Sequence, residues 1–125
     1  MEKKTIYEEV LKLGIGVNGK GFEYIVSGIE KCYNDPNIKT MDIYDTIAEE
    51  NDDTRSKVER AMRYYVGRCY KNGNVEELNK LRLPIDTIPP TSIFLKTFAL
   101  YLSLNCWTKN SRGLNRPLLK LFFFC

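Results

Sequence analysis

Apolar residues recur along this chain at the three- and four-residue spacing of amphipathic helices, and no segment alternates long enough to be a convincing β-strand. Turns rich in glycine, asparagine and proline separate the apolar stripes. Six helices are therefore expected, near residues 6–13, 21–33, 41–50, 54–72, 75–83 and 92–104. Thr40 and Ser92 are expected to cap the third and the last helix, because a hydroxyl oxygen can accept from a free amide of the first turn. The last helix is apolar nearly all round, which places it centrally in the core. The pattern predicts an all-α, compact six-helix domain.

Residues 14–19 match the spacing G-x-G-x-x-G of dinucleotide-binding loops. That function requires a strand before the glycines and a βαβ unit around them. Here an amphipathic helix is expected before them, and no strand is expected anywhere. We therefore interpret these glycines as a tight turn between the first two helices.

The strongest functional signal lies in the two helices on either side of residues 51–53. Residues 42–53 carry six acidic side chains and no basic one, whereas residues 54–72 carry six basic side chains against Glu59 alone. At about 100° per residue, the second helix has an apolar face and a cationic face. The apolar face comprises Val58, Ala61, Met62, Tyr65, Val66 and Cys69. The cationic face comprises Lys57, Arg60, Arg63, Tyr64, Arg68 and Lys71.

A cationic helix that follows an amphipathic helix after a short turn is typical of a helix-turn-helix, whose second helix enters the major groove of DNA. Arginine can give two hydrogen bonds to guanine there, and a carboxylate can accept from the cytosine amino group. Glu59 and Arg60 supply these two chemistries side by side, and the other cations suit phosphates. A merely solvated basic face is the alternative interpretation of the same pattern.

Composition limits the chemistry that the chain can perform. The net charge of +3 is too small to identify a nucleic-acid partner by itself. The absence of histidine removes the commonest general base and the commonest zinc ligand. None of the four cysteines lies at a C-x-x-C spacing. No signal peptide is apparent, and no apolar run approaches the roughly 18 residues of a membrane span. We expect no enzyme, no cofactor, no metal and no membrane contact, but a cytoplasmic protein with reduced thiols.

Residues 54–63, T-R-S-K-V-E-R-A-M-R, resemble the recognition helix of the C-terminal effector domain of the sporulation master response regulators of endospore-forming bacteria. The family pattern is close to T-x-S-[RK]-V-E-R-A-[IM]-R. Residues 13–24 resemble the family's opening I-G-[IV]-x(4,5)-K-G-Y-x-Y with an extra glycine, and residues 89–94 resemble P-T-x-S-x-F. Tyr33-Asn34-Asp35, Ile47-Ala48 and Gly73-Asn74 also fall at matching places. The resemblance covers residues 6–104, with two short deletions.

This resemblance implies a six-helix domain that binds short operator boxes in double-stranded DNA and controls transcription. The expected DNA-binding residues are Ser56, Lys57, Glu59, Arg60, Arg63, Tyr64 and Arg68. Lys57 stands where the family usually has arginine, so a bidentate contact becomes a point charge. Tyr64 stands where histidine is usual, which implies an altered backbone contact. A homodimer on tandem sites and a contact with RNA polymerase are the further partners that this interpretation includes.

Two departures from the family bear on regulation. Its members carry a phosphorylatable receiver domain, whereas Met1 here leads almost directly into the effector, so we expect a stand-alone domain without phosphorylation control. The expected organisation is a DNA-binding domain at 1–104 and a divergent tail of unassigned role at 105–125. The tail ends in the apolar run 117–125, expected to pack on the domain or on a second copy; a membrane anchor and an out-of-frame extension are the alternatives. The competing functional hypothesis is an interaction module that pairs with, or antagonises, a full-length regulator.

Overall fold

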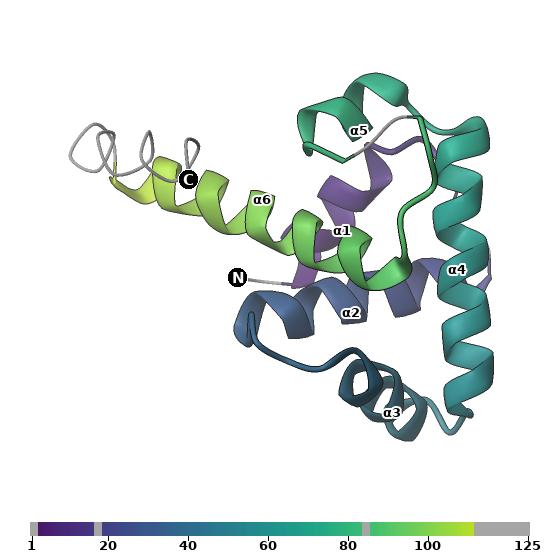
Figure 1. The fold of residues 1–125 in the computed structure, drawn as a ribbon. Helices are drawn as coiled ribbons and strands as arrows, with labels where there is room; N and C mark the ends of the chain where they lie inside the picture. The colour runs from purple at the N-terminus through teal and green to yellow at the C-terminus, as the bar shows by residue number, and fades with distance from the viewer. Residues whose placement is uncertain (1–2, 17–18, 84–85, 112–125) are drawn as a thin grey trace.

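The structure is a computed structural model that describes residues 3–16, 19–83 and 86–111 (Figure 1). Throughout those residues the only regular elements are α-helices, which confirms the prediction of an all-α fold with six helices. They are α1 (Lys3–Leu11), α2 (Lys20–Asn34), α3 (Thr40–Glu50), α4 (Arg55–Asn72), α5 (Val75–Lys80) and α6 (Thr91–Ser111).

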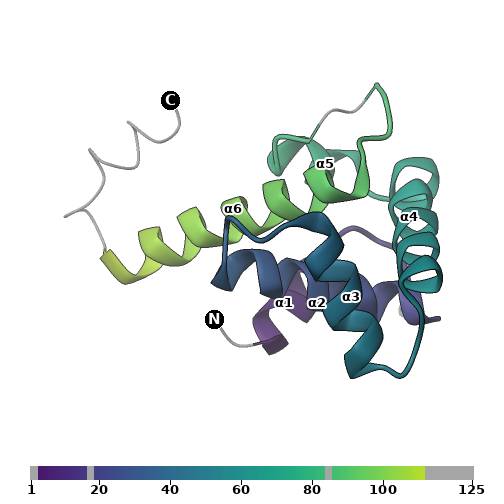
Figure 2. The ribbon, with the colours of Figure 1, turned by 60° about the horizontal axis from the view of Figure 1, so that its bottom comes forward.

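Helix α2 is the centre of the molecule and packs against α1, α3, α4 and α6 (Figures 1 and 2). The apolar residues at three- and four-residue spacing along α2, which are Phe22, Ile25, Val26, Ile29 and Cys32, form a stripe that is buried throughout. Tyr24, which the period leaves outside that stripe, is buried as well, at 2 % exposure. Each large apolar side chain that leaves water contributes about 1.5–3 kcal/mol to folding. A helix surrounded on most sides buries more than a single stripe, so α2 organises the core.

Helix α6 contributes the second large part of the core, but only through one face. Phe94, Leu95, Phe98 and Leu102 are buried against α2 and its neighbours. Ile93 and Leu100 are 48 % and 57 % exposed. The apolar residues all round this helix do place it centrally, as predicted, yet one side of it faces away from the core.

Helix α4 runs along one side of the molecule, across the ends of α2 and α6 (Figure 1). A Cβ atom on Gly21, at the start of α2, would lie 2.9 Å from the backbone carbonyl oxygen of Ala61 in α4. Glycine is therefore required at this crossing, because any side chain would push the two helices apart. Because α2 crosses α4 closely at Gly21, the side of α4 opposite to this crossing faces outward.

Several predicted boundaries differ from the observed ones. Thr40 and Ser92 are not caps: the amides of Ile43 and Phe94 donate to the carbonyls of Lys39 and Pro90, both at 3.1 Å. Helix α3 therefore begins one residue earlier, and α6 two residues earlier, than caps at Thr40 and Ser92 imply. Helix α5 ends at Lys80 because Arg82 adopts a left-handed φ of 67°, which breaks the helix.

The C-terminal boundary of the last helix also differs. Helix α6 passes the expected boundary at residue 104 without a break and ends at Ser111. The apolar run at 117–125 lies outside the described residues.

Candidate nucleic-acid interface

Helices α3 and α4 are joined by the four residues 51–54, which form a tight and well-defined turn. Asp52 has a φ of 52°, in the left-handed region that glycine usually occupies. This conformation lets the amide of Asp53 donate to the carbonyl of Ala48 at 2.9 Å. A hydrogen bond of this kind, from just past a helix end back to its last turn, is the Schellman motif. Helix α3 thus ends in a fixed geometry that directs the chain into α4.

The start of α4 is capped by Thr54, a role that the sequence analysis did not assign to it. The Thr54 hydroxyl accepts from the amide of Lys57 at 3.2 Å, which satisfies one of the free amides of the first turn. Such a cap contributes about 1 kcal/mol to helix stability. Thr54 lies just before the helix rather than inside it, so α4 begins at Arg55, one residue later than expected.

Asp53 connects the same turn to the core helix α2. The Tyr24 hydroxyl donates to one carboxylate oxygen of Asp53 at 2.6 Å, and the Thr54 amide donates to the other at 2.9 Å. The hydrogen bond from Tyr24 and then that from Thr54 lower the pKa of Asp53 below its ordinary value. Burial, and then the hydrogen bond to Asp53, raise the pKa of Tyr24 to about 12. At neutral pH the pair is therefore a phenol donating to a carboxylate.

Arg55 links α4 back to α3. Its Nε and Nη2 atoms donate to the two carboxylate oxygens of Asp45 at 2.6 and 3.0 Å. This hydrogen-bonded contact raises the pKa of the Arg55 guanidinium further. Sequence alone counts Arg55 among the cations of the helix, whereas the structure shows it occupied in holding the two helices together.

The seven sequence-predicted DNA-binding residues lie on one half of the α4 circumference, at about 100° per residue. Ser56, Lys57, Arg60, Arg63 and Tyr64 are exposed, and Glu59 and Arg68 are half-buried. The opposite half is buried in the core through Val58, Met62, Tyr65, Val66 and Cys69. We call the seven residues the outer face of α4: Ser56, Lys57, Glu59, Arg60, Arg63, Tyr64 and Arg68.

Two arginines of the outer face differ in their availability. Arg63 Nη1 lies 3.3 Å from Glu59 Oε1 in an ion pair one helical turn apart. An exposed pair of this kind is worth about 0–1 kcal/mol, so contacts with DNA can replace it readily. Arg60 has no ion-pair partner among the described residues, and its guanidinium is exposed. It can therefore donate to an incoming acceptor without breaking an existing contact.

The charges on the two helices are arranged asymmetrically. Helix α3 and the turn expose Asp42, Glu49 and Asp52, while α4 exposes arginine and lysine. A polyanion is therefore attracted to the α4 side and repelled from the α3 side. This asymmetry favours one orientation of the domain on a nucleic acid.

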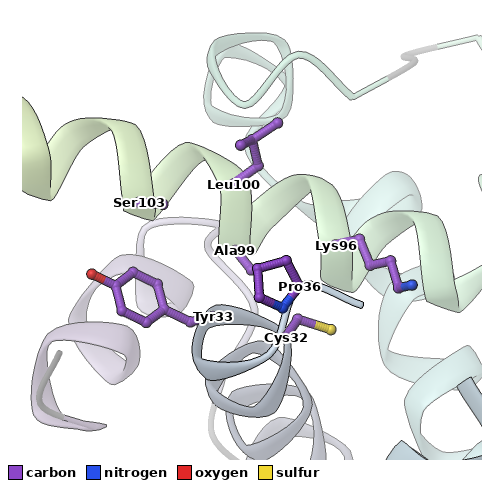
Figure 3. Close-up of a pocket in the computed structure, with 7 residues that line it drawn as sticks. All are labelled: Cys32, Tyr33, Pro36, Lys96, Ala99, Leu100 and Ser103. Atoms are coloured by element: carbon purple, nitrogen blue, oxygen red, sulfur yellow. The ribbon is translucent and has the colours of Figure 1, made fainter. Parts of the chain in front are cut away.

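Two of the hollows lined by the described residues bear on whether the protein has a ligand site apart from the outer face. An open groove of about 440 Å³ borders the outer face, between Glu59, Arg63 and the segment 88–92. A smaller pocket of about 90 Å³ lies between α2 and α6 (Figure 3). Burial raises the pKa of the Cys32 thiol in the smaller pocket, which keeps it protonated and a poor nucleophile. Ligand sites generally enclose 300–1,000 Å³, so this pocket is too small for a substrate.

Sequence reasoning missed the residues that hold α4 in place. Tyr24, Asp45 and Asp53 contact residues 10 to 29 positions away along the chain, and no local pattern reveals such partners. Tyr24 does belong to the motif by which the chain resembles the sporulation regulators. Membership of that motif was the one signal in the sequence that could have drawn attention to Tyr24, although the motif assigns the residue no role.

The fold and this surface together define a small helical DNA-binding domain with a helix-turn-helix formed by α3, residues 51–54 and α4. The chain belongs to the family described as sporulation initiation factor Spo0A, C terminal, whose model matches residues 6–102. The resemblance inferred from the sequence is thereby confirmed. The family is one of DNA-binding regulators of transcription in sporulation rather than of enzymes. None of the helices in the described part of the chain has the length and apolarity needed to cross a membrane.

Proposed function

We propose that this chain is a sequence-specific transcription regulator of the cytoplasm, in which α4 is the recognition helix and enters the major groove. The observation that carries this proposal is the exposed, unpaired guanidinium of Arg60 in the second turn of α4. The first turns of a recognition helix are the part that reaches base edges. The apolar half of α4 is buried against α2, so the outer face is the half that can meet DNA.

The outer face divides into residues that read bases and residues that bind phosphate. Arg60 donates to two acceptors of a guanine, and Glu59 accepts from the amino group of a cytosine. Lys57, Arg63 and Arg68 neutralise phosphates and fix the register of the domain. Ser56 and Tyr64 add hydroxyl groups at the edge of this contact. Lys57 acts as a point charge rather than as a bidentate donor.

Binding to two adjacent operator boxes would place two copies of the domain side by side as a homodimer. A regulator bound upstream of a promoter also requires a contact with RNA polymerase if it activates transcription. We include both partners in the proposal.

The proposal is tested by enriching a random duplex pool on the full chain and measuring binding to the enriched duplex by electrophoretic shift. A scrambled duplex of the same composition is the control. We expect the enriched duplex to bind about a thousand times more tightly or better, within the usual range of specific over non-specific affinity. If no sequence is enriched, the proposal fails and an interaction module that pairs with a full-length regulator becomes the better account.

Salt dependence gives a separate prediction for the same surface. Lys57, Arg63, Arg68 and the exposed Lys71 can each neutralise one phosphate, so log affinity should fall against log salt with a slope of about −3.6. Arg68→Ala should make that slope shallower by about 0.9. Affinity that is flat between 50 and 200 mM salt would show that the cationic side of α4 is merely solvated.

We also propose that residues 1–104 form the DNA-binding domain and that residues 105–125 contribute to stability or association. If residues 118–124 packed against no other surface, their apolar side chains would form an exposed hydrophobic patch that favours association. Truncation after Asn105 is therefore expected to change the melting temperature or the mass in solution. Truncation after Ser111 keeps all of α6 and still removes the apolar run, so comparison of the two variants separates the effect of that run from the effect of shortening the helix. Melting, mass and DNA binding identical to those of the full chain in both variants would make the tail a passenger.

A further inference from the structure

The entry into α4 is tied to the centre of the domain by a continuous chain of hydrogen bonds. Tyr24, on the core helix α2, donates to Asp53 Oδ2 at 2.6 Å, and Asp53 Oδ1 accepts from the Thr54 amide at 2.9 Å. Thr54 in turn accepts from the Lys57 amide at 3.2 Å. Lys20 Nζ lies 3.9 Å from Asp53 Oδ2 and adds a favourable charge. A side chain that is 2 % exposed thus controls the position of the first residues of the outer face.

A second fixed point lies further along α4, where Gly21 meets the backbone of Ala61. Thr54 is seven residues from Ala61, or about 10 Å along the axis at 1.5 Å per residue. If the first point were released, only the turn and the Arg55–Asp45 contact with α3 would hold the start of α4, and the helix could tilt about the second point. A tilt of about 10° would then displace the start of the helix by nearly 2 Å, whereas a binding constellation tolerates roughly 0.5 Å.

The apolar contacts between α2 and α4 do not replace this link. Packing of apolar side chains sets the distance and the crossing angle of the two helices, but the first buried side chain of α4 is Val58, so the residues before it are not held by the core. Hydrogen bonds to a carboxylate are directional and strong. Tyr24 and Asp53 therefore join the N-terminal turn of α4 to α2, while the Arg55–Asp45 contact joins it to α3.

We propose that Tyr24 and Asp53 are positioning residues for base reading, which set sequence discrimination rather than overall affinity for DNA. This inference rests on the proposed function of α4. Hydrogen bonds to base edges require the recognition helix at one angle, whereas cations on flexible side chains neutralise phosphates over a range of angles. Loss of the link should therefore weaken binding to an operator and spare binding to random DNA.

The test is Tyr24→Phe, which removes one oxygen atom while keeping the ring in the core and the surface charge unchanged. Affinity for the duplex enriched by the wild-type chain should fall about tenfold, the effect of one hydrogen bond to a charged group. Affinity for the scrambled duplex should change less than twofold, and its salt slope should stay the same.

Tyr7→Phe is the matched control. The Tyr7 hydroxyl also donates to a carboxylate, that of Glu23, and so joins α1 to α2. Tyr7→Phe therefore removes the same kind of hydrogen bond, but at a place away from the start of α4. The ratio of specific to non-specific affinity should stay at the wild-type value in this variant. A double variant provides a further check: in an Asp53→Ala background, Tyr24→Phe should no longer change the ratio, because the hydroxyl acts through that carboxylate.

A measurement without DNA separates this inference from the proposed function. Amide hydrogen exchange at Thr54 and Lys57 should become faster in Tyr24→Phe and stay unchanged in Tyr7→Phe. If the wild-type chain shows no sequence discrimination, the proposed function fails, and exchange alone decides whether Tyr24 holds the helix start. If the wild-type chain discriminates and Tyr24→Phe keeps both the ratio and the slow exchange, the positioning role is overturned while the proposed function stands.

Discussion

Replacing Arg60 by alanine is expected to reduce affinity for the specific operator by about 1–3 kcal/mol, while affinity for random DNA hardly changes. The guanidinium of Arg60 is exposed in the second turn of α4 and has no competing carboxylate among the described residues. Truncation of the Arg60 side chain should therefore remove contacts with bases without breaking an ion pair inside the protein. The decisive quantity is the ratio of specific to non-specific affinity, measured by titration of the enriched and scrambled duplexes.

Lys71→Ala is the matched control for Arg60→Ala. Lys71 is an exposed cation on the same side of α4 but near its C-terminal end. It should weaken binding to both duplexes by similar small amounts, as expected for a phosphate contact. Neither variant should change the melting temperature appreciably, because both side chains face away from the core. A specificity ratio that Arg60→Ala leaves intact, in a folded protein, would mean that this helix does not read sequence.

The largest expected effect on stability is that of Gly73→Ala, at the end of α4. A Cβ atom there would lie 2.3 Å from the carbonyl oxygen of Cys69 and 2.9 Å from that of Leu13. Both oxygens belong to the backbone, so relief requires the end of α4 or the segment after α1 to move. The adjacent hydrogen bond from the Asn74 amide to Leu13, at 2.8 Å, would be strained as well. We expect a loss of about 3 kcal/mol or more, in the range of the severe single substitutions.

Gly67→Ala is the matched control for this substitution. Gly67 lies inside α4, and a Cβ atom there would meet nothing within 4 Å. Alanine should therefore stabilise the helix by about 0.5–1 kcal/mol. Thermal unfolding of both variants, followed by circular dichroism, measures the difference. Similar melting temperatures for the two variants would contradict the close approach that the structure places at Gly73.

The sequence predicts α4 well because its signals are local. Gly73 ends the helix and the apolar period identifies its buried half, whereas the cap at Thr54 was not predicted. The prediction failed where a neighbouring backbone decided the outcome. Thr40 and Ser92 carry capping side chains, yet the carbonyls of Lys39 and Pro90 already accept the first helical hydrogen bonds. The capping propensity of a residue shows that it can begin a helix, whereas the conformation of the backbone before it determines where the helix does begin.

The positions of the candidate DNA-binding side chains on α4 were predictable from the sequence, but the residues that hold α4 in place were not. The helical period alone places Arg60 and Glu59 on the outward half of α4. Tyr24 appears off the stripe of α2 because a period of 3.6 assumes one buried face, and α2 is packed on most of its sides. The contact between Arg55 and Asp45 depends on how α3 folds back on α4. Such partners follow from tertiary structure, which a single sequence does not display.

The left-handed turn at Asp52 has a consequence for how this domain can diversify. Four residues separate the last turn of α3 from the first turn of α4, and the hydrogen bonds made by this turn depend on its length. One inserted or deleted residue would take the Asp53 amide away from Ala48 and the Asp53 carboxylate away from Tyr24, so α4 would lose its fixed entry. Substitutions on the outer face, by contrast, leave those hydrogen bonds unchanged. Under the proposed function, new operator preferences are therefore accessible through point changes in α4, whereas a change in the length of the turn would misplace the whole helix.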